Sequence, residues 1–205
     1  MGLRDLFRRA PKICAPHELA LFVDRHAAFV VQKGIFEYSR ARAGHFAKVM
    51  FNEQEFLRAV EVSRWRAYPL GLAMVGEVVE GVLRPHYRSE RGDELAALSE
   101  LVLSVFDRYP EPPLLAEGEW AAARADLARR LGLIGLHPVK RVIDIPEPLA
   151  KAYFDLMPIH ERLRGRDFPT MLNYLKIVLC NVHDELTSRL DAPALVDALL
   201  DTGPV

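Results

Sequence analysis

Two cysteine–histidine pairs with identical spacing are the residues of this chain best suited to chemistry. Cys14-Ala-Pro-His17 and Cys180-Asn-Val-His183 each place an imidazole three residues after a thiol. Thiolate and imidazole ligands in a set of four suit tetrahedral Zn²⁺. The chain has seven histidines, however, so this offset also arises by chance. We predict no cofactor, and keep a zinc site of Cys14, His17, Cys180 and His183 as a minor alternative.

Cationic and aromatic side chains are concentrated between residues 38 and 68. The ligand-binding candidates among them are Arg40, Arg42, His45, Arg64, Trp65, Arg66 and Tyr68. Arginine binds carboxylates and phosphates through paired hydrogen bonds, and tryptophan or tyrosine rings stack on planar groups. The cluster therefore predicts a site for a small anionic ligand or for the acidic surface of a partner. Glutamates are interspersed, as at Glu61 and Arg64, so a solvated face with internal ion pairs is the competing interpretation.

Glu77 and Glu80 are two carboxylates three residues apart in an otherwise apolar stretch. Such a pair can bind a metal ion or act as an acid and a base. Arg84 follows Glu80 by four residues, which is the spacing of a stabilising helical ion pair. We therefore expect an ion-paired outer strip on this helix.

Common catalytic signatures are missing from the sequence. It has no Gly-x-Ser-x-Gly elbow, no glycine-rich phosphate loop, no His-Glu-x-x-His and no Glu-x-x-His. These motifs mark serine hydrolases, nucleotide-binding sites, zinc proteases and di-iron bundles. We therefore predict a protein that is not an enzyme, with an enzyme as the alternative.

The helices that must position these residues are marked by their starts. Asp144, Asp167 and Asp191 each precede a proline by two positions. An N-cap carboxylate accepts free backbone N–H groups, and proline suits the first helical turn. After Asp167, apolar residues recur every three or four positions, which predicts a long amphipathic helix. This ladder consists of Phe168, Leu172, Leu175, Leu179, Val182 and Leu186.

Further helices are expected along the rest of the chain. Their predicted ranges are 17–50, 53–84, 93–109 and 118–131, with short ones after Pro146 and Pro193. The first range is one long helix or two consecutive helices, with Gly34 and Gly44 as its weak points. Phe51 is expected to staple against Phe56 at the start of the helix over 53–84. Proline removes an internal hydrogen bond, so this helix should kink at Pro69, or end near Ala67 and restart. Residues 133–145 are predicted to be a loop.

These elements predict an all-α fold, a single-domain bundle of about eight helices with little or no strand. Residues 1–16 are expected to be a basic, partly ordered N-terminal segment, and residues 17–205 the all-α domain. The stiff, proline-rich connector gives a possible sub-boundary at 110–117.

Composition limits the partners. The 27 basic residues nearly cancel the 28 acidic ones, so we expect no nucleic-acid binding. The longest nearly uncharged stretch, 67–76, is half the length of about 20 residues that a bilayer span needs, so no transmembrane segment is expected. Two cysteines and no signal-peptide pattern favour the cytoplasm. The excess of arginine over lysine is typical of GC-rich, bacterial coding sequences.

Two further features bear on partners. Residues 1–12 interleave arginines with Leu3, Leu6 and Phe7, which suits weak contact with a membrane surface. The apolar set Leu195, Val196, Leu199 and Leu200 near the C-terminus favours a homodimer. The leading interpretation is thus a non-catalytic all-α protein that acts through protein–protein interaction or self-association. The alternative is a helical bundle that binds a small anionic ligand or a metal.

Overall fold

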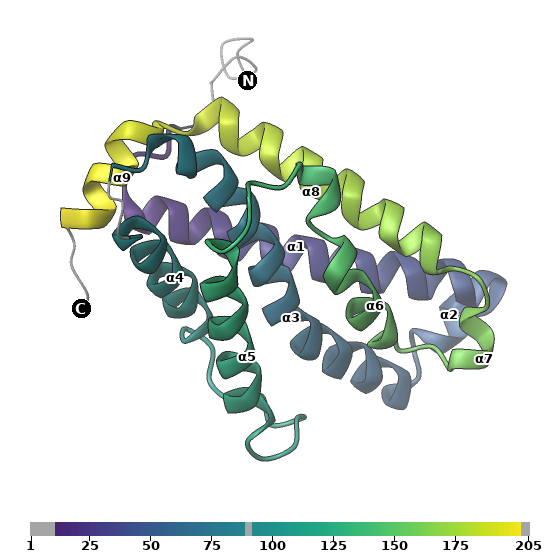
Figure 1. The fold of residues 1–205 in the computed structure, drawn as a ribbon. Helices are drawn as coiled ribbons and strands as arrows, with labels where there is room; N and C mark the ends of the chain where they lie inside the picture. Colours follow the sequence, from purple (N-terminus) through teal and green to yellow (C-terminus); the bar gives the residue numbers. More distant parts are fainter. Residues whose placement is uncertain (1–10, 89–91, 202–205) are drawn as a thin grey trace, which may run out of the picture.

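The computed structural model describes residues 11–88 and 92–201, and these residues form an all-α bundle (Figure 1). Its α-helices are α1 (Pro16–Ala43), α2 (Ala47–Met50), α3 (Gln54–Leu83), α4 (Asp93–Phe106), α5 (Glu119–Ile134), α6 (Glu147–Asp155), α7 (Glu161–Arg164), α8 (Phe168–Arg189) and α9 (Ala192–Asp201). Short 3-10 turns are η2 (Gly44–Phe46), η3 (Arg84–His86) and η4 (Val142–Asp144). The described residues contain no sheet, so the predicted fold class is confirmed.

The long first helix ends at Gly44, one of the two glycines at which the sequence allows a break. One long helix or two consecutive helices were expected over residues 17–50, and the structure has two α-helices, because α1 stops at Ala43 and a tight turn leads into η2 and α2. Gly44 makes this turn with φ of 53°, a conformation that disfavours residues with a Cβ. Gly34, which shares the low helix propensity of Gly44, remains helical within α1. Phe51 and Phe56 then pack edge to face at 5.1 Å, which confirms the predicted staple.

The centre of the bundle is the second half of α3. Every residue from 67 to 76 is buried, including Pro69. The expectation that the helix ends near Ala67 and restarts is wrong, because α3 is one helix from Gln54 to Leu83. Packing on all sides of this stretch outweighs the cost of one lost backbone hydrogen bond.

The predicted ladder helix is confirmed as α8. Leu175, Leu179 and Leu186 on this helix are fully buried. Its start is not capped as expected, since no backbone N–H group of α8 donates to the Asp167 carboxylate. Asp191 does cap α9, because Ala194 N donates to its Oδ1 at 3.4 Å.

The two ends of the described chain lie together. Ile13 is 1% exposed and pairs with the α8–α9 connection, its N–H donating to Arg189 O at 2.9 Å. Asp191 N donates in return to Ile13 O. Residues 1–10, which carry most of the predicted basic segment and its membrane-contact residues, lie outside the described residues.

Three of the four apolar residues predicted at the C-terminus are covered by the protein's own chain, and the fourth, Leu200, is 38% exposed. Leu195, Val196 and Leu199 are buried, and α9 packs mainly against α4. The connector 110–117 joins α4 to α5, and both of these helices pack on α3 within the same core. No helix in the described ranges combines the length and the apolar character needed to cross a bilayer.

Gly34 provides a test of the packing between α1, α6 and α8. A Cβ at this position would lie 2.3 Å from the hydroxyl oxygen of Tyr153 and 2.8 Å from Tyr174 Cε1. The Tyr153 hydroxyl is held by the backbone oxygens of Val30 and Val31, at 3.2 and 3.3 Å. Gly34→Ala should therefore reduce the free energy of unfolding by about 1–3 kcal/mol in a urea titration.

Gly132 on α5 is the matched control, since a Cβ there would meet no atom within 4 Å. Gly132→Ala should raise the stability by about 0.4–1 kcal/mol. Equal effects of the two substitutions would contradict the close approach at Gly34.

Candidate functional site

An aromatic cluster gathers around Trp65 on α3. The Trp65 ring packs edge to face against Tyr109 at 5.6 Å and against Trp120 at 5.7 Å. Trp120 in turn stacks on Phe106 at 4.1 Å. Tyr109 comes from the segment after α4 and Trp120 from the first turn of α5, so three separate parts of the chain build the cluster. Such ring pairs add stability beyond the area that they bury.

A pocket of about 320 Å³ opens beside this cluster. Its lining residues are Trp65, Arg66, Leu115, Glu119, Trp120, Ala123 and Leu156. The lining is therefore apolar and aromatic apart from one arginine and one glutamate. Its volume falls at the lower end of the range of small-molecule sites.

The two arginines of the predicted site have different surroundings. Arg66 donates from Nε and Nη2 to both carboxylate oxygens of Glu119, at 2.6 and 3.0 Å. This bidentate pair lowers the pKa of Glu119, mainly through the hydrogen bond from Arg66. Arg64 does not line the pocket, and its buried Nε has no hydrogen-bond partner. No ion pair joins Arg64 to Glu61 in the described part of the chain.

Tyr68 turns away from the pocket toward α1. Its hydroxyl donates to Asp24 Oδ1 at 2.7 Å, and the Tyr109 hydroxyl donates to the same oxygen at 2.9 Å. Burial, followed by the hydrogen bond to Asp24, raises the pKa of Tyr68 well above its ordinary value. Asp24 thus joins α1, α3 and the segment after α4, which is a structural role.

The other predicted ligand residues lie near the end of α1. Arg42 pairs with Asp167 at 3.2 Å and donates to the backbone oxygen of Leu163. The Tyr38 hydroxyl donates to Asp167 as well, and burial together with this bond raises the pKa of Tyr38 to about 12. Asp167 therefore connects the start of α8 to α1 and does not cap its own helix.

Arg40 and His45 are exposed at the same end of α1. The His45 ring lies 3.9 Å from that of Phe46. The seven predicted ligand residues thus form two groups, one around the end of α1 and one in the middle of α3. Only Trp65 and Arg66 of this set line the pocket.

The two cysteine–histidine pairs lie on different elements. Cys14 precedes α1 and His17 lies in its first turn, while Cys180 and His183 lie on α8. Both thiols are free, and the backbone N–H of Cys14 donates to Glu18 Oε2 at 2.8 Å. Within residues 11–88 and 92–201, no three or more His, Cys, Asp or Glu side chains are grouped so as to hold a metal ion.

Glu77 and Glu80 tie α3 to the segment after α5. Glu80 forms the expected ion pair with Arg84, but it is 2% exposed and so lies inside the bundle and not on an outer strip. Arg84 also donates to the backbone oxygens of Ile134 and His137, at 2.9 and 2.7 Å. Lys140 lies 2.8 Å from Glu77. These ion pairs give the two carboxylates a structural role.

A charged network at the α1–α8 contact was missed by the sequence reasoning. The buried His26 lies 3.3 Å from Glu185 Oε2, and the same carboxylate binds Arg25 and Arg189. Burial lowers the pKa of His26, and the charge of Glu185 opposes this only in part. The spacing of His26 in the sequence could have indicated its burial, because His26 follows Phe22 by four residues and precedes Val30 by four, on the apolar face of α1.

Comparisons with protein-family models, with curated proteins and with solved structures found no match for this chain. Its function must therefore be inferred from its own residues. Among residues 11–88 and 92–201, the pocket beside Trp65 and the exposed side chains around the end of α1 offer contacts to another molecule.

Asp24→Ala tests the structural role of the two tyrosine hydroxyls. It would leave two partly buried donors without their acceptor, so we expect a loss of about 1–3 kcal/mol of stability by urea titration. Asp184→Ala is the matched control, because that carboxylate is 80% exposed, and its effect should stay within about 0.5 kcal/mol. A loss at Asp24 no larger than at Asp184 would contradict the assignment.

The pKa of His26 leads to a prediction about pH. Because the folded pKa lies below the ordinary value of 6.5, the unfolded chain takes up a proton here first as the pH falls. The contribution of the uncharged His26 to the free energy of unfolding is therefore complete above about pH 6.5. Below that pH it declines by at most about 1.4 kcal/mol per pH unit. Unfolding titrations between about pH 7.5 and 5.5 should show this decline in wild type and a smaller one in His26→Gln.

The exposed His45 offers the same substitution as a control. His45→Gln should leave the decline as it is in wild type. Identical pH dependence in wild type and His26→Gln would show that burial of this histidine does not govern it.

Proposed function

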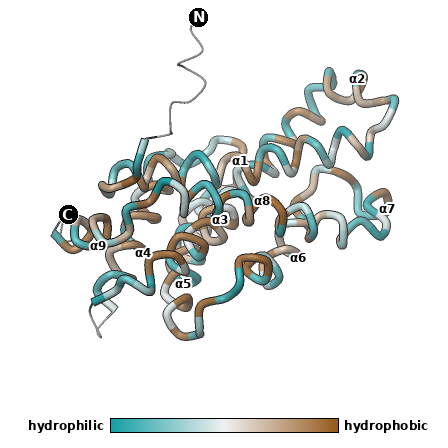
Figure 2. Tube along the Cα trace, turned by 90° about the horizontal axis from the view of Figure 1, so that it is seen from above, coloured by the Kyte–Doolittle hydropathy of each residue, from teal (hydrophilic) through white to brown (hydrophobic). Residues whose placement is uncertain are grey.

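We propose that this protein is a non-catalytic interaction protein that self-associates through the end of the bundle around α2. We call this surface the α2 end and define it as residues 29–61. It comprises the second half of α1, η2, α2 and the first turns of α3. Figure 2 shows α2 at the outer edge of the molecule, at the far end of α1 from α9.

Exposed apolar side chains at the α2 end are the observation that carries this proposal. Its large exposed residues are Phe29, Phe36, Phe46, Val49 and Leu57. Phe46 and Val49 are each 59% exposed, and their spacing of three residues places them on one side of the turn and helix. Apolar side chains grouped on a surface mark sites of interaction with other proteins.

The Phe36 side chain extends this surface along α1. It is 44% exposed, and its ring lies 4.8 Å from that of Phe51. Phe29, two turns earlier on α1, is 46% exposed and carries the Lys33 ammonium 5.2 Å above its ring. Aromatic residues are enriched at protein interfaces because they bury large areas with few rotatable bonds.

The charges at the α2 end favour a second copy of the chain as the partner. Several charged residues here make no ion pair with any other described residue; these are Lys33, Glu37, Arg40, Lys48, Glu53, Glu55, Arg58 and Glu61. Both signs are equally represented, so the surface does not select a partner of one charge. A two-fold interface in which the cations of one copy face the anions of the other would pair these charges.

Sedimentation equilibrium over the micromolar range tests the proposal. We expect the wild-type mass to rise above that of the monomer with concentration. Phe46→Gln combined with Val49→Gln should weaken the association about tenfold or more, because truncating central aromatic contacts commonly costs over 1 kcal/mol.

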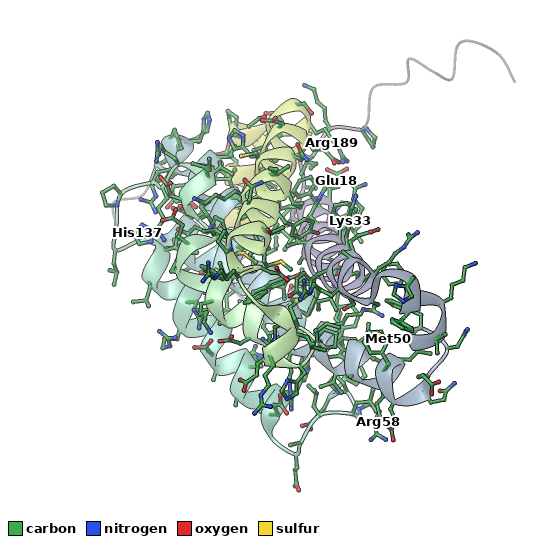
Figure 3. All side chains as sticks on the ribbon, turned by 90° about the vertical axis from the view of Figure 1, so that its right-hand side faces the viewer. Glu18, Lys33, Met50, Arg58, His137 and Arg189 are labelled. Carbon is green, nitrogen blue, oxygen red and sulfur yellow. The ribbon has the colours of Figure 1, made fainter. Side chains whose placement is uncertain are left out.

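Leu136→Gln is the matched control, because Leu136 is 79% exposed but lies after α5. Figure 3 places its neighbour His137 on the opposite side of the molecule from Met50 and Arg58, which belong to the α2 end. Association should be unchanged in this variant. A wild-type protein that stays monomeric, or equal weakening by both changes, would contradict the proposal.

A further inference from the structure

We propose that the pocket beside Trp65 and Trp120 binds a small, uncharged aromatic molecule. This site goes beyond the proposed self-association, because its lining residues lie outside the α2 end. Trp65 and Arg66 come from the middle of α3, and Glu119, Trp120 and Ala123 come from α5. Leu115 and Leu156 complete the lining from two other segments.

The arrangement of the two indole rings determines which ligand shape the pocket accepts. Their planes stand at 89° to each other, with centroids 5.7 Å apart. A planar ring stacked on one indole would therefore meet the face of the other indole with its edge. Both arrangements are favourable for aromatic pairs. Leu115, Ala123 and Leu156 have apolar side chains, which suits a ring without polar substituents on that side.

The ion pair between Arg66 and Glu119 determines which ligand charge the pocket favours. Arg66 and Glu119 satisfy each other through two hydrogen bonds, so the pair presents no net charge to the pocket. An anionic ligand would have to displace Glu119 from Arg66, and a cationic ligand would have to displace Arg66 from Glu119. Either displacement leaves a charge without its partner. An uncharged ligand leaves the pair intact.

Trp65 and Trp120 are the only tryptophans in the sequence, so the intrinsic fluorescence of the protein reports on this pocket. N-phenyl-1-naphthylamine is a neutral aromatic probe that absorbs where tryptophan emits. 1-Anilinonaphthalene-8-sulfonate shares its ring system and adds one negative charge. Titration of wild type with the neutral probe should quench the tryptophan emission saturably, with one site per chain. The sulfonate should bind about tenfold more weakly or worse.

Two alanines near the start of α5, Ala121 and Ala123, provide a matched pair of variants. Ala123 lines the pocket, whereas Ala121 is exposed on the other side of α5. Ala123→Leu should fill the pocket and weaken binding of the neutral probe about tenfold, and Ala121→Leu should bind as wild type does.

Glu119→Gln is an independent test that does not require filling the pocket. It removes the partner charge of Arg66, so the preference should shift toward the sulfonate probe. Three results would each overturn the proposal: no saturable quenching in wild type, equal binding by the two alanine variants, or a sulfonate that binds wild type as tightly as the neutral probe. An unchanged probe preference in Glu119→Gln would overturn the role given to the ion pair.

Discussion

Close contact between α1 and α3 at Gly71 sets the arrangement of the other helices. A Cβ at this position would lie 2.9 Å from Val31 Cγ2 and 3.0 Å from the backbone oxygen of Ala27. Farther along α3, a Cβ at Gly76 would lie 3.2 Å from Leu131 on α5. The two glycines thus let α3 approach a helix on each side. This dense packing explains how Pro69, buried just before Gly71, is accommodated within a continuous helix.

The sequence predicted those parts of the structure that depend on local spacing. The apolar ladder of α8 and the ion pair of Glu80 with Arg84 both follow from the three- and four-residue repeats of a helix. The same reasoning failed where distant residues compete for a side chain. Asp167 was expected to cap α8, but its carboxylate binds the Tyr38 hydroxyl, which lies 129 positions earlier in the chain.

The candidate site shows the same limit. Trp65 and Arg66 could be singled out by residue type, but the partner of Arg66 is Glu119, 53 positions away, and not a neighbouring glutamate. Leu115 and Leu156 complete the pocket from segments that no local pattern connects to α3. The apolar residues available for association could not be located either. Leu195, Val196 and Leu199 of α9 are used inside the bundle, whereas Phe46 and Val49 at the α2 end remain on its surface, and only the tertiary packing distinguishes the two groups.

The core is thus completed around α3, and the α2 end is a separate apolar surface, to which we propose that a second copy binds. Amide hydrogen exchange, measured residue by residue from about 5 to about 200 µM protein, tests this division most directly. Residues 67–83 should exchange slowest at every concentration, and amides of residues 36–58 should become more protected as the concentration rises. Exchange at 67–83 as fast as at α2, or protection of 36–58 that does not change with concentration, would contradict the account.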